Sequence, residues 1–243
     1  MGLSLRLPPD DRDWRAFSAD AEEMAARLLL RDAIGGRFRG RIALVSSFGP
    51  EAAVLLHLVA QIDRAVPVII VDTGKLFGET LRYRDALVRR LGFSDVRSAE
   101  PDAPALALHV PDGTLFRRDP DACCRLRKVE PLERALEGFS AWINGRKRFQ
   151  GGLREAIPVV ERAGRRIKFN PLARWSAHEI DAYFTAYDLP RHPLEADGYR
   201  SIGCMPCTSP VASGEDARAG RWRGTGKAEC GLHLAAPVSG QMA

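Results

Sequence analysis

The sequence predicts an α/β protein with an open, mainly parallel sheet and helices on both faces. Short apolar runs at residues 41–46 and 66–71 are typical of strands that are buried on both sides. A loop and a helical pattern follow each run, and such repeats predict parallel strands joined by right-handed crossovers. The chain has 243 residues, 45% hydrophobic and 28% charged, so it is an ordinary globular sequence that can bury a sizeable core.

The individual elements follow in a regular order. Asp20 and Glu23 have the spacing of a capping box, which predicts a first helix over residues 20–34 that ends at Gly35 and Gly36. The expected strands are residues 41–46, 66–71, 96–99 and 140–144, with a hairpin over 158–169. The other expected helices are residues 52–62, 79–91, 122–136 and, after a second capping box, 176–187. A Pro-rich loop is expected between residues 99 and 122.

Composition divides the chain near residue 190. Residues 1–190 carry the periodic patterns and are predicted to form one α/β domain, with an N-terminal helical segment over about residues 1–36. Residues 191–243 are rich in Gly, Pro and Cys and have little periodicity. We therefore expect a C-terminal functional segment that ends in a flexible tail.

Composition and the N-terminal sequence also bear on compartment and partners. Residues 1–11 contain acidic residues and prolines instead of the apolar core of a signal peptide, and no apolar run reaches the roughly 18–20 residues that cross a bilayer. Five cysteines, an odd number with one adjacent pair, fit a reducing compartment better than a disulfide framework. We expect a cytoplasmic protein without membrane contact. The formal charge of +5 suits an anionic small molecule as well as a nucleic acid.

Four of the cysteines form two pairs. Cys123 and Cys124 are adjacent on a predicted helix, whereas Cys204 and Cys207 frame a Cys-x-x-Cys loop. Two thiolate pairs predict a metal centre, either zinc or iron–sulfur. Adjacent helical residues point about 100° apart, which suits two different irons of one cluster better than one zinc ion. The alternative is a set of buried cysteines without a ligand.

Three loops follow the carboxyl ends of predicted strands, where open parallel sheets bind their ligands. These loops are residues 46–51 (Ser-Ser-Phe-Gly-Pro-Glu), 72–74 (Asp-Thr-Gly) and 145–148 (Gly-Arg-Lys-Arg). The first opens a helix, whose free N–H groups favour an anion, and the third offers arginines that bind phosphate or sulfate bidentately. Taken singly, the first is also compatible with an ordinary strand–helix turn and the third with a solvated basic loop.

The fifth cysteine, Cys230, is a candidate nucleophile. Within the twelve residues before it lie the cations Arg218, Arg221, Arg223 and Lys227. Nearby cations stabilise a thiolate and also attract an anionic substrate. Lys128 follows Cys124 by four residues and is expected on the same helix face, toward both a cluster and a substrate. The alternative is a basic tail with an incidental thiol.

These segments together resemble the assimilatory adenylyl-sulfate (APS) and phosphoadenylyl-sulfate (PAPS) reductases. The resemblance spans roughly residues 40–233 and rests on residues 46–51, 71–74, 76–80, 145–148 and 218–222, and on the highly specific Glu-Cys-Gly-Leu-His of residues 229–233. It implies an adenine-nucleotide α-hydrolase-like fold, with residues 1–190 as the nucleotide-binding domain. Within this family, Cys-Cys together with Cys-x-x-Cys marks enzymes that carry a [4Fe-4S] cluster and typically prefer APS, and this sequence has both pairs.

The resemblance also implies a role for individual residues. Cys230 would be the catalytic nucleophile, which attacks the sulfur of APS, expels AMP and becomes an S-sulfocysteine. Thioredoxin, or a glutaredoxin-like protein, would then release sulfite. The [4Fe-4S] cluster would be held by Cys123, Cys124, Cys204 and Cys207. The substrate would be bound by Ser46, Ser47, Phe48, Gly49, Val71, Lys128, Gly145, Arg146, Arg154, Arg218, Arg221 and His233.

Three other functions stay open. A PAPS reductase performs the same chemistry on a 3′-phosphorylated nucleotide, although PAPS-specific members lack the four cysteines. A cluster-containing tRNA thiolation enzyme generally has a Ser-Gly-Gly-x-Asp-Ser loop, which this sequence lacks. A zinc-stabilised nucleic-acid-binding protein suits the basic charge but leaves residues 229–233 unexplained, so we expect no nucleic-acid partner. The sequence leaves a homo-oligomer open.

Overall fold

The computed structural model describes residues 11–233, so the first ten residues of the expected N-terminal segment and the last ten of the expected tail lie outside it. Within this range, six strands form one sheet in the order β3-β2-β1-β4-β6-β5. Neighbouring strands are parallel except for β5, which pairs with β6 in the antiparallel direction. The open, mainly parallel sheet predicted from the sequence is confirmed.

The strands lie where the apolar runs predict them. The parallel strands are β1 (Ile42–Val45), β2 (Val68–Val71), β3 (Val96–Ala99), β4 (Ala141–Ile143) and β6 (Arg166–Phe169). The predicted hairpin joins β5 (Val160–Ala163) to β6. At its turn Gly164 has a φ of 61°, a conformation that glycine adopts at little cost.

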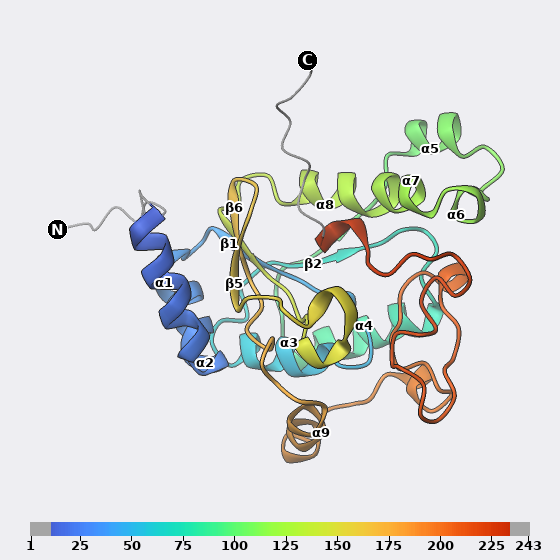
Figure 1. Ribbon diagram of the computed structural model, residues 1–243. Helices are drawn as coiled ribbons and strands as arrows, with labels where there is room; N and C mark the ends of the chain where they lie inside the picture. Colours follow the sequence, from blue (N-terminus) through green and yellow to red (C-terminus); the bar gives the residue numbers. More distant parts are fainter. Residues whose placement is uncertain (1–10, 234–243) are drawn as a thin grey trace.

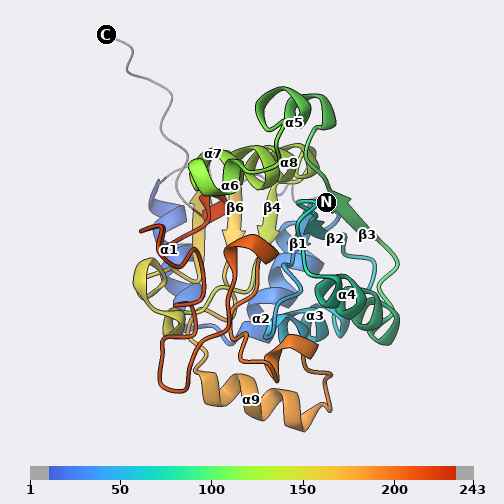
Figure 2. The same ribbon diagram turned by 90° about the vertical axis from the view of Figure 1, so that its right-hand side faces the viewer.

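Helices cover both faces of the sheet (Figures 1 and 2). Along β1 the side chains alternate between two hydrophobic cores, with Leu44 in the larger core and Ala43 in the smaller one. The larger core packs against α1 (Asp11–Glu23), α2 (Ala26–Arg31), α3 (Ala52–Ala60), α4 (Gly78–Leu91) and α9 (Ala177–Ala186). The smaller core contains Leu132 of α8 (Glu130–Ala135) and Leu136, which follows it.

The first helix does not begin where the capping-box spacing predicts. Helix α1 (Asp11–Glu23) starts nine residues earlier, so Asp20 lies inside it and the prediction is wrong. The reason is tertiary packing: Phe17 and Ala21 lie four residues apart on one helix face and are both buried in the larger core. An acidic pair at this spacing therefore forms part of a longer amphipathic helix here.

The chain then continues in α2 (Ala26–Arg31) and the π-helical turn η1 (Asp32–Arg37), which contains both glycines that were expected to end the helix. The expected Pro-rich loop also holds two helices, α5 (Ala103–His109) and α6 (Leu115–Arg118). Asp102 caps α5 by accepting the Ala105 N–H, and a proline lies in its first turn. Proline suits the first helical turn, so taking it as a loop signal was wrong at this position.

The helix expected over residues 122–136 is interrupted by a π-helical turn. It consists of α7 (Pro120–Cys124), η2 (Arg125–Val129) and α8. Such turns are rare and often occur at functional sites. The short helical turns of the structure are η3 (Arg148–Gln150), η4 (Gly152–Arg154), η5 (Pro193–Glu195), η6 (Met205–Cys207) and η7 (Gly231–His233). None of the described helices has the length and apolarity that crossing a membrane requires.

His192 makes the stability of this fold depend on pH. The ring is 1% exposed, its Nδ1 accepts the Leu194 N–H, and its Nε2 lies 3.1 Å from Thr80 Oγ1. Burial lowers the pKa of His192 to about 4, whereas the unfolded value is near 6.5. Because the unfolded chain binds the proton first, stability that is present above pH 6.5 is lost as the pH falls toward 4, by up to about 3 kcal/mol. Urea unfolding at several pH values should show this decrease, and a His192→Gln variant should lack it; an identical decrease in both proteins would contradict the assignment.

Candidate active site

The candidate site lies where the strand order reverses direction. From β1 the chain proceeds to β2 on one side, and from β4 it proceeds to the β5–β6 hairpin on the other, so the loops after β1 and β4 diverge. Open α/β sheets bind ligands in the crevice at such a switch point. A cavity of about 210 Å³ occupies it, lined by residues that follow β1, β2 and β4.

The structure brings most of the predicted substrate-binding residues to this cavity. Its lining includes Cys230 together with Ser46, Ser47, Gly49, Val71, Lys128, Gly145, Arg146, Arg154, Arg218, Arg221 and His233. Phe48 is different, because its side chain is fully buried in the larger core. Its φ of 48° is unusual for a residue with a side chain, and its N–H donates to Ser46 Oγ at 3.1 Å. Phe48 therefore anchors the loop and does not line the cavity.

The basic loop after β4 is tied down by acidic and amide groups. Arg146 forms an ion pair with Glu161 and donates from Nε to Asn144 Oδ1 at 3.3 Å. Lys147 Nζ donates to Glu51 Oε2 at 2.6 Å and to the Gly145 carbonyl at 2.8 Å. The loop is thus a shaped wall of the cavity, and its charges are largely balanced by the protein itself.

Cys230 lies buried at the centre of the site. Its side chain packs with Cys124 and Trp222 and is 7% exposed. The pKa of the Cys230 thiol is lowered, first by a hydrogen bond with Cys124 and then by the charges of Lys128 and Arg221, against the effect of burial. Burial opposes the charge on Lys128, yet the nearby thiols hold its pKa above the usual value. Lys128 and Arg221 are therefore the neighbours whose positive charges favour a thiolate at Cys230.

Trp222 organises the cations around this thiol, a role that the sequence did not indicate. Its indole lies under Lys128, Arg221 and Lys227, with 5.8, 4.4 and 5.6 Å from each charged group to the ring centroid. Such cation–π contacts are stronger when desolvated, and Trp222 is 4% exposed. The Arg-Trp pair within residues 218–222 was a visible signal, but nothing in the sequence placed it beside Cys230.

Glu229 also lines the cavity, and it neutralises two of the predicted substrate-binding arginines. Arg154 donates from Nε and Nη2 to the carboxylate at 2.5 and 3.0 Å, and Arg218 Nη2 donates at 3.2 Å. Burial raises the pKa of Glu229, but the hydrogen bonds and charges of Arg154 and Arg218 outweigh it and lower the pKa to about 2. Nothing in the local sequence pattern indicates this role for Glu229.

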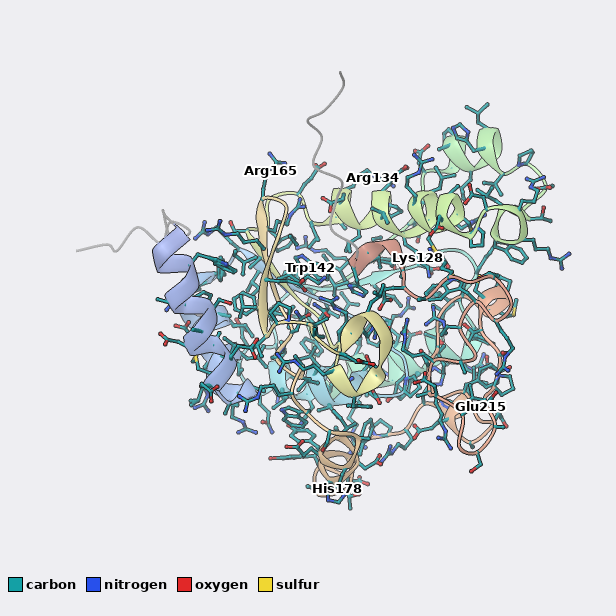
Figure 3. The ribbon with its side chains drawn as sticks, in the orientation of Figure 1. Lys128, Arg134, Trp142, Arg165, His178 and Glu215 are labelled. Carbon is teal, nitrogen blue, oxygen red and sulfur yellow. The ribbon has the colours of Figure 1, made fainter. Side chains whose placement is uncertain are left out.

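His233 closes the cavity on the side of the sheet. Its ring stacks on Trp142 with 6.2 Å between centroids and 14° between planes. Burial and the charges of Lys168 and Arg146 hold the pKa of His233 well below its usual value, so the ring is neutral. Trp142 and Lys128 lie on either side of η7, which carries His233 (Figure 3). Residues 227–233, called the tail from here on, therefore lie with η7 between β4 and η2.

The other four cysteines meet at a second, smaller cavity next to the first. Its lining includes Cys123, Cys124, Cys204 and Cys207 together with Arg127 and Lys128. The Cys-x-x-Cys loop is brought there by a bridge between Leu76 and Cys204 and by the Met205 N–H, which donates to the Lys75 carbonyl at 2.8 Å. Lys128 lines both cavities and so connects the thiols with the crevice.

The donors that line this second cavity are four thiols, the ligand type of both zinc sites and iron–sulfur clusters. Among the described residues, no group of three or more His, Cys, Asp or Glu side chains is arranged to hold one metal ion. A single zinc ion requires four ligands at about 2.0–2.3 Å from one point, whereas each cysteine of a four-iron cluster binds a different iron.

Comparisons with known proteins agree with this geometry. Residues 41–210 match the model of the phosphoadenosine phosphosulfate reductase domain. An adenosine 5′-phosphosulfate reductase of a Chelativorans species is 49% identical over 96% of both chains, and a phosphoadenosine 5′-phosphosulfate reductase of Gloeobacter violaceus is 41% identical over 87% of this chain and 90% of that one.

The fold is also that of a solved structure. The crystal structure of phosphoadenylyl-sulfate reductase from Candida auris superposes with a TM-score of 0.70 at 24% identity, covering 84% of this chain and 99% of that chain. The likeness in fold, the match to the domain model and the identity to full-length relatives lead to one conclusion. This chain belongs to the phosphoadenosine phosphosulfate reductase family.

Proposed function

We propose that this chain reduces adenylyl sulfate to sulfite and AMP in assimilatory sulfate reduction, within a reducing cytoplasm. The observation that carries the proposal is the position of Cys230, a buried thiol beside Lys128 and Arg221 that lines the crevice at the strand ends. The name of the Chelativorans relative supports APS as the substrate. The nucleotide would lie across the loops after β1, β2 and β4, with its phosphosulfate toward Cys230.

The first step is an in-line attack by the Cys230 thiolate on the sulfuryl sulfur. A sulfur–sulfur bond forms, the bond from sulfur to the bridging phosphate oxygen breaks, and AMP leaves with that electron pair. The product on the enzyme is an S-sulfocysteine. Lys128 and Arg221 would offset the repulsion between the thiolate and the sulfuryl oxygens, because both charges already face this thiol.

The second step needs a dithiol reductant of the thioredoxin or glutaredoxin type. One of its thiolates attacks the Cys230 sulfur, and sulfite leaves with the electron pair of the sulfur–sulfur bond. The second thiol then resolves the mixed disulfide and restores the Cys230 thiol. Two thiols supply both electrons, so the reaction requires no other electron carrier.

The four-cysteine cavity fits a [4Fe-4S] cluster, with Cys123, Cys124, Cys204 and Cys207 as its ligands. When bound, the cluster would hold the Cys-x-x-Cys loop against η2 and place its charge beside Lys128. Thr73 would support this arrangement, since its Oγ1 lies 3.2 Å from Cys204 Sγ.

PAPS is the second candidate substrate, favoured by the name of the Gloeobacter relative. Anaerobic purification followed by a visible spectrum, iron and sulfide analysis and a thioredoxin-dependent sulfite assay tests both substrates on one sample. We expect a brown protein with about four iron atoms per chain that releases sulfite faster from APS than from PAPS. Zinc in place of iron, together with no sulfite from either nucleotide, would overturn the proposal.

A further inference from the structure

We infer that Glu229 is a positioning residue, whose carboxylate fastens the segment that carries Cys230 onto Arg154 and Arg218. The inference rests on the proposed function in one respect, because it takes Cys230 as the nucleophile. It adds a partner within the protein for two arginines that the resemblance implies as substrate-binding residues.

The contacts of the carboxylate fix the tail at the residue next to the nucleophile. Arg154 binds both of its oxygens, from Nε at 2.5 Å and from Nη2 at 3.0 Å. Oε1 also accepts from Arg218 Nη2 at 3.2 Å and from the backbone N–H of Cys230 at 2.9 Å. The bidentate pair defines the orientation of the carboxylate, and the N–H contact passes that orientation to the Cys230 backbone.

Arg154 is itself held in place on the side away from the tail. Its Nη1 donates to Gln150 Oε1 at 2.5 Å, and Gln150 Nε2 donates to Glu51 Oε2 at 2.8 Å. Glu51 belongs to the loop after β1, so a continuous series of hydrogen bonds runs from the crevice loop to Glu229. All three side-chain nitrogen atoms of Arg154 therefore already donate hydrogen bonds to Glu229 or Gln150.

Two other cations of the crevice, Arg221 and Lys128, keep N–H groups that can donate to a ligand. Arg221 Nε is buried and has no hydrogen-bond partner among the described residues. Lys128 contacts the Trp222 ring and faces the thiols, and within the described part of the chain it forms no ion pair. These two groups are thus better placed than Arg154 to meet an anion that is brought to Cys230.

The clamp acts together with other contacts of the docked tail, namely the packing on Trp222, the stacking of His233 on Trp142 and the ion pair between Lys227 and Asp121. The glycine that follows Cys230 lies against Val129 of η2, and the Arg218 Nη2 group also donates to the Ala228 carbonyl at 3.1 Å. With its side chain only 4% exposed, Glu229 forms charge-assisted hydrogen bonds that are shielded from water and salt. Because this clamp is the contact next to the nucleophile, removing its charge should loosen the segment around Cys230 and make the thiol more accessible.

The alternative is that Glu229 competes with the substrate for the two arginines, and the two roles make opposite kinetic predictions. If Glu229 competes with the substrate, weakening its hold on the arginines would lower KM and leave kcat unchanged. A positioning residue that is weakened would lower kcat, because Cys230 spends less time at the substrate, and would leave KM within about twofold.

A Glu229→Gln variant tests the inference, with Glu215→Gln as the matched control. Glu215 pairs with Arg223 at 3.2 Å in the same C-terminal segment, but the pair is exposed and lies apart from η7 (Figure 3). The substrate-free readouts are the rate of Cys230 alkylation by iodoacetamide, resolved by peptide mass spectrometry, and the backbone hydrogen exchange of residues 227–233. Thermal melts establish that each variant is folded.

We expect Glu229→Gln to raise the alkylation rate and the exchange rate about tenfold or more, and to lower kcat by a similar factor. Glu215→Gln should match the wild type, and Glu229→Asp should restore part of the protection because it keeps the charge. Unchanged alkylation and exchange in Glu229→Gln, or a lower KM with unchanged kcat, would overturn the inference. Absence of sulfite production by the wild type would instead overturn the proposed function, and the alkylation comparison would still decide whether Glu229 docks the tail.

Discussion

A Cys230→Ser variant is expected to lose sulfite production by at least about a thousandfold while it keeps its nucleotide affinity. The Cys230 thiol lines the crevice beside Lys128 and Arg221, two cations that favour its anion. Serine has almost the same size, so the packing against Trp222 and Cys124 should be retained. Its hydroxyl, however, is not ionised by these neighbours and cannot form the sulfur–sulfur bond.

The measurement is thioredoxin-dependent sulfite release, paired with AMP binding by calorimetry on the same preparation. Binding should stay within about threefold of the wild type, because the predicted nucleotide contacts lie in the loops after β1 and β4. In a complementary experiment, wild-type protein incubated with APS without reductant should carry a sulfonate on the Cys230 peptide. Sulfite release that survives the substitution would exclude Cys230 as the nucleophile.

The parts of this structure that the sequence predicted are those specified by local patterns. Buried apolar runs identify strands such as β1 and β2 because both faces of a parallel sheet are covered, and each run ends in turn residues. The crevice followed from the same logic, since the carboxyl ends of parallel strands share one edge. Cysteine spacing alone then separated one thiol from two pairs. All four paired cysteines line the second cavity, and Cys204 lines the crevice as well, together with Cys230.

The parts that the sequence did not predict depend on contacts between distant segments. Arg154 and Glu229 are 75 positions apart, and nothing in either local pattern shows that they form a buried ion pair. Phe48 lies in a cavity loop by sequence but turns into the core, since its backbone adopts a left-handed conformation. The start of α1 was missed because the burial of Phe17 by the sheet domain outweighed a local capping signal.

A Cys207→Ser variant should lose its iron and most of its activity, about a hundredfold, although Cys207 lies in the second cavity and not among the residues that line the crevice. The link is the loop that follows it. The Cys207 carbonyl accepts the Trp222 N–H at 3.0 Å, and Thr208 forms a backbone bridge with Arg221. A Cys-x-x-Cys loop released from η2 would therefore displace both groups that line the Cys230 side of the crevice.

Met205→Ser is the control for this prediction, because Met205 is on the same helical turn between the two cysteines but is 57% exposed and does not line the cavity. It should keep both iron and activity. The visible spectrum, iron content and sulfite release of the two variants are compared under anaerobic conditions. Full activity in iron-free Cys207→Ser protein would show that the reaction at the crevice does not need the cluster. Lost activity with retained iron would instead assign the effect to the backbone of the loop, because the Trp222 and Arg221 contacts pass through main-chain atoms.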